Sequence, residues 1–145
     1  MKKRFRFRLQ RILQFRETEK NERARLLAER NRELFDANTR LDDILQAQEG
    51  ANPPEEQAAT MAEFLLQGDY QARLREALIE QRLLVLEAAK AVEDAREAYI
   101  EKSRETESLE RVKAKRREIF EEEKRHDERK EQDNLTVQRY RLKKG

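Results

Sequence analysis

The second half of the chain repeats a row of mostly apolar residues every seven positions, and this repeat limits the available folds more than any other feature. A second row lies four residues before the first. Two interlocked rows spaced three and four residues apart form the seam along which one helix packs on another. The first row contains Leu78, Val85, Val92, Tyr99, Thr106, Lys113 and Phe120, and the second contains Leu74, Gln81, Ala88, Ala95, Lys102, Leu109 and Arg116.

A matching row lies in the first part of the chain, where the seven-residue spacing joins Leu13, Leu27, Leu34 and Leu41, with Lys20 as its one gap. A companion row contains Ala24, Ala37, Ile44 and Leu45 together with the polar residues Asn31 and Asn38. Polar residues in such a seam lower stability and can fix the register of the two helices. They also indicate places where one helix continues without its partner.

Turn-forming residues are concentrated between the two halves. Gly50, Asn52, Pro53 and Pro54 predict a break, and Gly68-Asp69 predict a weaker one. Between these breaks lies a short amphipathic stretch that contains Ala58, Met61, Ala62, Phe64, Leu65 and Leu66. We expect a helix arm over about 5–48, a connection over 49–69 with a short helix, and an arm over about 70–140. The predicted fold is all-α, a single coiled-coil domain over 1–145 built as a long two-helix antiparallel hairpin.

The composition supports a narrow apolar seam between two helices and argues against a broad hydrophobic core. Charged residues make up 44% of the chain and hydrophobic residues 37%, with no Trp, so too few apolar side chains exist to fill a globular interior. Disorder is disfavoured because 33 basic and 31 acidic residues nearly balance, and the commonest residues are strong helix formers. Arms of roughly 65 Å and 105 Å predict that the C-terminal third projects beyond the N-terminus.

The sequence offers little for catalysis or metal binding. No glycine-rich phosphate loop is present, cysteine is absent, and His126 is the single histidine. His126, Asp127 and Glu122 have helical spacing, but one helix face rarely supplies enough converging ligands for a metal, so we interpret them as solvated. We therefore expect no enzyme, no metal and no cofactor. Without a membrane-length apolar run or an apolar signal region, a soluble cytoplasmic protein is expected.

Basic and apolar residues alternate at the N-terminus. The cations are Lys2, Lys3, Arg4, Arg6, Arg8, Arg11 and Arg16, and the interleaved apolar residues are Phe5, Phe7, Leu9, Ile12, Leu13 and Phe15. The C-terminus adds Arg139, Arg141, Lys143 and Lys144 around Tyr140. A hairpin would bring both ends to one basic pole, which suits an acidic protein partner. A solubilising tail, or a surface for nucleic acid or anionic membranes, remains an alternative, although the nearly neutral chain shows no nucleic-acid recognition motif.

Three segments resemble the flagellar FliJ family of the type III export apparatus. The opening FRFRLQRILQFRETEKNERARLLAE, residues 5–29, is similar to the family's N-terminal signature of alternating Phe and basic residues followed by Leu-Gln. The segment from Tyr70 through Gln81 to Ala88 resembles the start of the second arm, and AREAYIEKSRETESLERVKAKR, beginning at Ala95, resembles its continuation. Injectisome stalk proteins share this architecture.

The resemblance implies a non-enzymatic stalk that resembles the shaft of rotary ATPases. Its terminal end would bind and promote a hexameric export ATPase, and the protein would link this ATPase to the cytoplasmic component of the export gate and recycle export chaperones. It would be cytoplasmic and attached to the inner-membrane export apparatus only through partners, with no nucleic acid expected. A generic coiled-coil adaptor is the alternative.

Residue roles follow from the resemblance as expectations. The ATPase-facing residues would be Phe5, Phe7, Arg8, Leu9, Arg11, Ile12 and Phe15. The seam would contain Leu27, Leu34, Leu41, Val85, Val92 and Tyr99. The gate or chaperone contact would involve Phe64, Leu65, Leu66, Tyr70 and Leu74.

Overall fold

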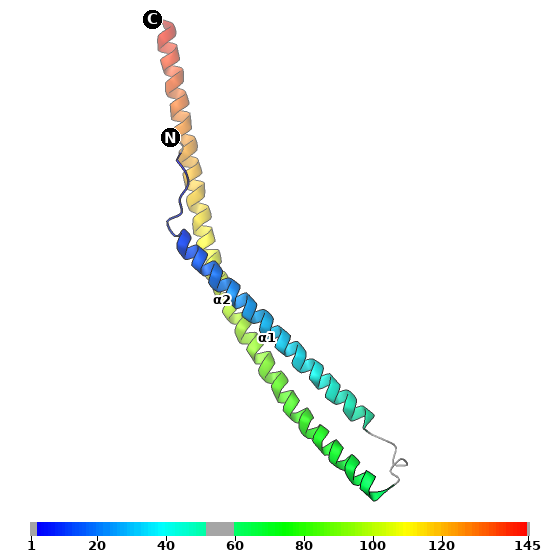
Figure 1. Ribbon diagram of the computed structural model, residues 1–145. Coiled ribbons are helices and arrows are strands. Elements are labelled where there is room, and N and C mark those ends of the chain that lie inside the picture. The colour runs from blue at the N-terminus through cyan, green and yellow to red at the C-terminus, as the bar shows by residue number, and fades with distance from the viewer. Residues whose placement is uncertain (1–2, 52–59, 145) are drawn as a thin grey trace. The chain divides into compact units, whose positions relative to one another are not determined.

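The protein is all-α, as the sequence predicts. In the computed structural model, which describes residues 3–51 and 60–144, helix α1 spans Gln10–Gly50 and helix α2 spans Met61–Lys144 (Figure 1). These helices contain 41 and 84 residues, and the described residues include no strand. The predicted break at Asn52, Pro53 and Pro54, and Ala58 of the short amphipathic stretch, lie outside the described residues.

Helix α1 begins at Gln10, so the expectation of a helix from about residue 5 is wrong for the first turn. Residues 3–9, which we call the strap, are non-helical and end in a turn where the Gln10 amide donates to the Phe7 carbonyl at 3.1 Å. The strap is rich in cations, and cations are unfavourable beside the positive end of a helix dipole. The side chain of Phe7 is also buried, which holds the strap outside the helix.

Helix α2 begins at Met61 instead of at about residue 70, so the separate short helix and the break at Gly68-Asp69 are wrong. Thr60 lies directly before the helix, and its hydroxyl accepts a hydrogen bond from the Glu63 amide at 3.2 Å. This is the N-cap bond of a Thr-x-x-Glu sequence, which is a helix-start signal. A single interior glycine costs about 1 kcal/mol, which a long helix tolerates, so α2 continues through Gly68.

The chain divides into two compact units: residues 1–20 with 102–145, and residues 21–101. In the second unit, the Gln81 amide donates to the Ala37 carbonyl at 2.9 Å and the Gln71 amide donates to the Ala51 carbonyl at 3.1 Å. From the first of these contacts to the second, the residue in or directly after α1 advances from 37 to 51, while the residue in α2 falls from 81 to 71. This order shows that the two helix segments of this unit run antiparallel. Knobs-into-holes packing of a coiled coil stays a prediction.

The long row of the second half is the packed face of α2. Every member of the row from Leu78 to Phe120 is buried or half-buried, and Val92 retains only 4% of its exposed surface. All six predicted seam residues follow this pattern, because Leu27, Leu34, Leu41, Val85 and Tyr99 are half-buried.

The companion row of α1 follows the prediction except at its two polar members. Ala24, Ala37, Ile44 and Leu45 are half-buried, whereas Asn31 and Asn38 are exposed. Three residues after Leu13 and Leu27, the side chains of Arg16 and Arg30 are half-buried as well. Both asparagines face water, where their amides need no protein partner.

The last part of α2 continues as an uncovered helix within the first unit. The strap reaches Phe120, while every residue over 125–144 is exposed. In Figure 1 the strap lies beside α2 well before the C-terminal end of the same helix. The predicted C-terminal overhang is therefore present within this unit.

Candidate functional site

The strap is held against α2 by aromatic contacts. The ring centroids of Phe5 and Phe120 are 5.7 Å apart at an interplanar angle of 51°, a tilted arrangement that aromatic pairs favour. The guanidinium of Arg116 lies 5.8 Å from the centroid of the Phe7 ring, within the range of a cation–π contact. Phe7 is 8% exposed. These contacts give the strap a defined place on the helix.

The strap and α2 enclose an open groove of about 880 Å³. The aromatic side chains of Phe5, Phe7 and Phe120 line it. Eight cations and one carboxylate, Glu121, also line the groove. The cations are Lys3, Arg4, Arg6, Arg8, Arg11, Lys113, Arg117 and Lys124. We call this feature the basic groove. Its charge is far from the near-neutral balance of the whole chain.

The cations of the basic groove form no ion pair with a carboxylate in the described part of the chain, although Glu121 lines the same groove. The ion pairs found there involve Arg16, Arg30, Arg96 and Lys102, and none involves a groove cation. Unneutralised cations at short distances from one another repel, and an anionic ligand relieves this repulsion. The groove is therefore suited to a negatively charged partner.

The first turns of α1 add exposed apolar surface beside the strap. Ile12 is 47% exposed and Phe15 is 60% exposed, and Arg8 and Arg11 are also exposed. Among the residues predicted to face a partner, these four are free to do so. Phe7 is buried, and Phe5 and Leu9 are half-buried, so these three support the strap.

The two basic ends do not form one pole. The strap meets α2 at Phe120, whereas the C-terminal cations begin at Arg139. At 1.5 Å per residue, the distance along the helix between them is about 30 Å. Lys144 lies 5.0 Å from the Tyr140 ring centroid. The sequence expectation of a shared basic pole is therefore wrong, because the overhang that the sequence itself predicts separates the two basic ends.

Four charged side chains form a ring in the unit that contains the strap. Arg16 Nη1 lies 2.8 Å from Glu105 Oε2, and Lys102 Nζ lies 2.9 Å from Glu19 Oε2. Contacts of 3.5 Å along each helix, Arg16–Glu19 and Lys102–Glu105, close the ring. The hydrogen bond from Lys102 holds the pKa of Glu19 below its ordinary value, and the hydrogen bond to Glu19 raises the pKa of Lys102. We call these residues the charge ring; the sequence reading placed Lys102 in the seam but missed its partners.

The start of α2 presents a second apolar surface. Phe64, Leu65, Leu66 and Tyr70 are exposed, while Leu74 is half-buried. A stripe that the sequence reading missed follows it, with Ile79 61% exposed, Leu83 56% exposed and Leu86 67% exposed. Spacings of four and three place them on one helix face. The sequence contains a signal for this stripe, because residues 77–92 include more apolar side chains than the two seam rows can cover.

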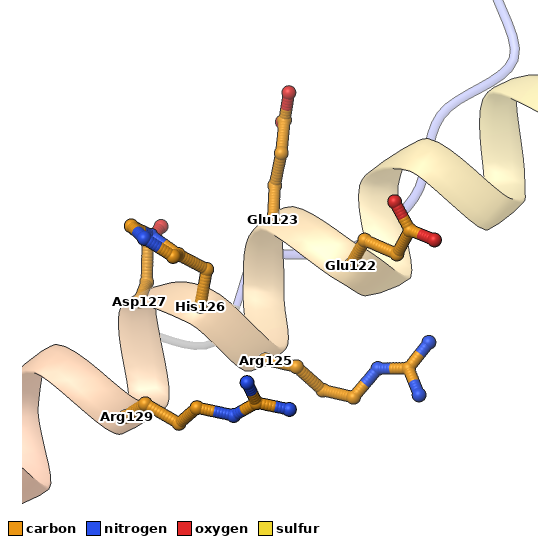
Figure 2. A pocket seen from close by; sticks show the side chains of 6 residues that line it. All are labelled: Glu122, Glu123, Arg125, His126, Asp127 and Arg129. Atoms are coloured by element: carbon orange, nitrogen blue, oxygen red, sulfur yellow. The ribbon is translucent and has the colours of Figure 1, made fainter.

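The residues around His126 do not form a metal site. Figure 2 shows six side chains of this stretch of α2, with Glu122 and Glu123 pointing in different directions and Arg125 and Arg129 extending on the side away from Glu123. Over residues 3–51 and 60–144, no three His, Cys, Asp or Glu side chains are placed to share a metal ion.

Neither α1 nor α2, within the described ranges, has a segment apolar and long enough to cross a lipid bilayer. Comparison with curated proteins found no match, and comparison with solved structures found none. The family model described as Flagellar FliJ protein matches residues 5–145, nearly the whole chain. The chain therefore belongs to the flagellar FliJ family and is a component of flagellar protein export.

Proposed function

We propose that this protein is a non-enzymatic central-stalk component that binds the hexameric flagellar export ATPase and promotes its assembly. The observation that carries the proposal is the uncovered surface formed by Arg8, Arg11, Ile12 and Phe15, where cations adjoin exposed apolar side chains. Cations steer the approach of an acidic partner, and the apolar side chains supply desolvated contacts once it has docked. Membership of the FliJ family supplies the setting.

The same proposal assigns a second partner to the other exposed apolar surface. Phe64, Leu65, Leu66 and Tyr70 lie on α2 in the unit that does not contain the strap. We assign to this surface the contact with the cytoplasmic component of the export gate, or with export chaperones that the protein helps to recycle. Attachment to the inner-membrane export apparatus would then occur at its cytoplasmic side, through these partners.

The test measures ATP hydrolysis and hexamer content of the cognate export ATPase with and without this protein. We expect both to rise when the protein is added. Phe15→Ala, which truncates a side chain 60% exposed, should weaken the stimulation, whereas Phe35→Ala, which truncates one 70% exposed in the other unit, should leave it intact. A folded, helical protein that leaves the ATPase unchanged would overturn the proposal.

A generic coiled-coil adaptor is the second candidate, and one observation favours it. The exposed stripe of Ile79, Leu83 and Leu86 resembles the uncovered half of a helix–helix interface. An adaptor would self-associate through this stripe and ignore the ATPase. Sedimentation analysis separates the two candidates, because the stalk proposal expects a monomer at micromolar concentration, and Leu83→Glu would dissociate an adaptor oligomer.

A further inference from the structure

We infer that the basic groove binds a short acidic segment of polypeptide. The groove has the size, charge and lining for such a ligand: a volume of about 880 Å³, eight cations against one carboxylate, and three aromatic side chains. The groove alone indicates the chemistry of the ligand. The assignment of this acidic segment to the export ATPase rests on the proposed function.

Six of the eight groove cations are exposed, and Lys113 and Lys124 are half-buried. Arg4, Arg6, Arg8 and Arg117 are exposed, and their guanidinium groups make none of the ion pairs found in the described residues. Arginine binds carboxylates through two parallel N–H donors, which gives geometric as well as electrostatic preference. Cations from the strap and from α2 face the same space, so an acidic segment would be contacted from two sides.

The aromatic lining favours a polypeptide over a simple anion. Phe5 and Phe120 are half-buried and their rings are already in contact, so each retains surface that a ligand can cover. Apolar side chains interspersed among acidic ones would cover this surface while the carboxylates meet the guanidinium groups. A ligand of alternating acidic and apolar residues fits both properties of the groove.

The neighbourhood of the groove limits the length of the anion. On the far side of Phe120, α2 carries Glu122 and Glu123. A second hollow there is lined by four carboxylates against three cations, so the excess of positive charge ends at the basic groove; the carboxylates are Glu123, Asp127, Glu128 and Glu131, and the cations are Lys3, Lys124 and Lys130. A nucleic acid or an anionic membrane extends its negative charge well past a groove of this size, and these carboxylates would repel it. A short acidic segment can end before it reaches them.

The experiment uses the full-length protein and a fluorescein-labelled synthetic decapeptide that alternates Glu and Leu, read by fluorescence anisotropy. The groove variant combines Arg4→Gln, Arg6→Gln and Arg117→Gln. The matched control combines Arg139→Gln, Arg141→Gln and Lys143→Gln, which removes three cations outside the groove. We expect the groove variant to lose about tenfold in affinity, the control to bind like the unmodified protein, and added salt to weaken binding.

Three results would overturn the inference. The unmodified protein fails to bind the decapeptide, or the groove and control variants bind it equally well. Alternatively, single-stranded DNA or phosphatidylglycerol vesicles bind more tightly than the decapeptide and lose this binding in the groove variant, which would assign the groove to one of those polyanions.

The ATPase assay separates this inference from the function on which it partly rests. If the unmodified protein stimulates the ATPase and the groove variant stimulates it equally, the stalk function stands and the groove's assignment to the ATPase fails. If the decapeptide binds in the groove but the ATPase does not respond, the groove takes an acidic segment and the proposed function fails.

Discussion

The guanidinium Nη1 of Arg16 lies 2.8 Å from Oε2 of Glu105, a residue 89 positions away in the chain. With Glu19 and Lys102 this pair forms the charge ring, in which each charge has neighbours of the opposite sign. The four side chains keep between 23% and 35% of their exposure. At this depth, an unmatched charge is unfavourable.

The charge ring specifies the register of the two helix segments in its unit. If α2 slipped by three residues in one direction, Arg16 would face Lys102. If it slipped by three residues in the other direction, Glu19 would face Glu105. A slip of one seven-residue repeat would place Arg16 opposite Ala98 or Val112. Each alternative creates a repulsion or leaves a charge without a partner, so the observed register is favoured over its nearest competitors.

Reversing one charge in the ring should therefore destabilise the protein, and reversing all four should restore it. Glu19→Lys places a third cation beside Arg16 and Lys102, so its Tm should fall. The fourfold variant combines Arg16→Glu, Glu19→Lys, Lys102→Glu and Glu105→Lys, and this restores the alternation of signs. Thermal unfolding followed by circular dichroism gives both values. A fourfold variant no more stable than the single one would contradict the register role.

The ring also predicts how stability depends on pH. Because the pKa of Glu19 is held below its ordinary value of 4.5, Glu19 stabilises the fold above that pH, and this contribution is lost as the pH falls through the lowered value. The raised pKa of Lys102 has the opposite sign: its contribution is present below pH 10.5 and is lost as the pH rises beyond it.

The measurement compares the Tm of the unmodified protein with that of Glu19→Gln across the pH range. The difference should be largest between about pH 5 and 10 and should shrink toward both extremes. Glu107→Gln, at an exposed position outside the ring, is the matched control and should shift the Tm little at any of these pH values. A difference that stays constant into acid would show that Glu19 gains nothing from Lys102.

Leu13 anchors the unit that contains the strap. It is 2% exposed, the lowest fraction among the large apolar side chains described. Leu13→Ala should lower the free energy of unfolding by about 2–4 kcal/mol through lost burial and a residual cavity. Leu142→Ala, at a position 80% exposed, should change it by less than about 0.5 kcal/mol. Urea unfolding measures both, and similar losses in the two variants would contradict the packing seen around Leu13.

Gly68 is a site where the helix can be strengthened. It lies inside α2, has no positive φ, and an added Cβ would meet no atom within 4 Å. Gly68→Ala should raise the free energy of unfolding by about 0.5–1 kcal/mol, because alanine loses less backbone entropy in a helix. Gly50→Ala, at the last residue of α1, should have a smaller effect. Urea unfolding of both variants tests this, and a loss of stability in Gly68→Ala would indicate that the turn around Gly68 is not regular helix.

The sequence predicts the packed face of α2 well because the seven-residue period depends only on local geometry. The row from Leu78 to Phe120 remains covered even at Thr106, which is 1% exposed and whose hydroxyl donates to the Lys102 carbonyl at 2.8 Å. That intrahelical bond removes the cost of burying a hydroxyl, so a polar residue can occupy a seam position. Periodicity is therefore a stronger guide here than the polarity of single residues.

The errors arise where a local signal competes with contacts made elsewhere. Gly68 predicts a break, but the cap at Thr60 and the regular helix on both sides keep α2 continuous. Phe5 and Phe7 fit the helical pattern, yet their contacts with Phe120 and Arg116 hold the strap outside α1. Such contacts join residues more than a hundred positions apart, and no short-range pattern contains them.

The uncovered end of α2 has a consequence for how order is distributed along the molecule. Over residues 125–144 each backbone hydrogen bond is maintained by the helix–coil balance alone, since no second helix covers it. Amide hydrogens there should exchange with solvent in a gradient that steepens toward Lys144, by fraying one turn at a time. Amides near Leu13 and Thr106 exchange only when the two helix segments separate. The ordered length of this end can therefore change, and a protein that bound it would lengthen the ordered part of α2 without changing the packed seam.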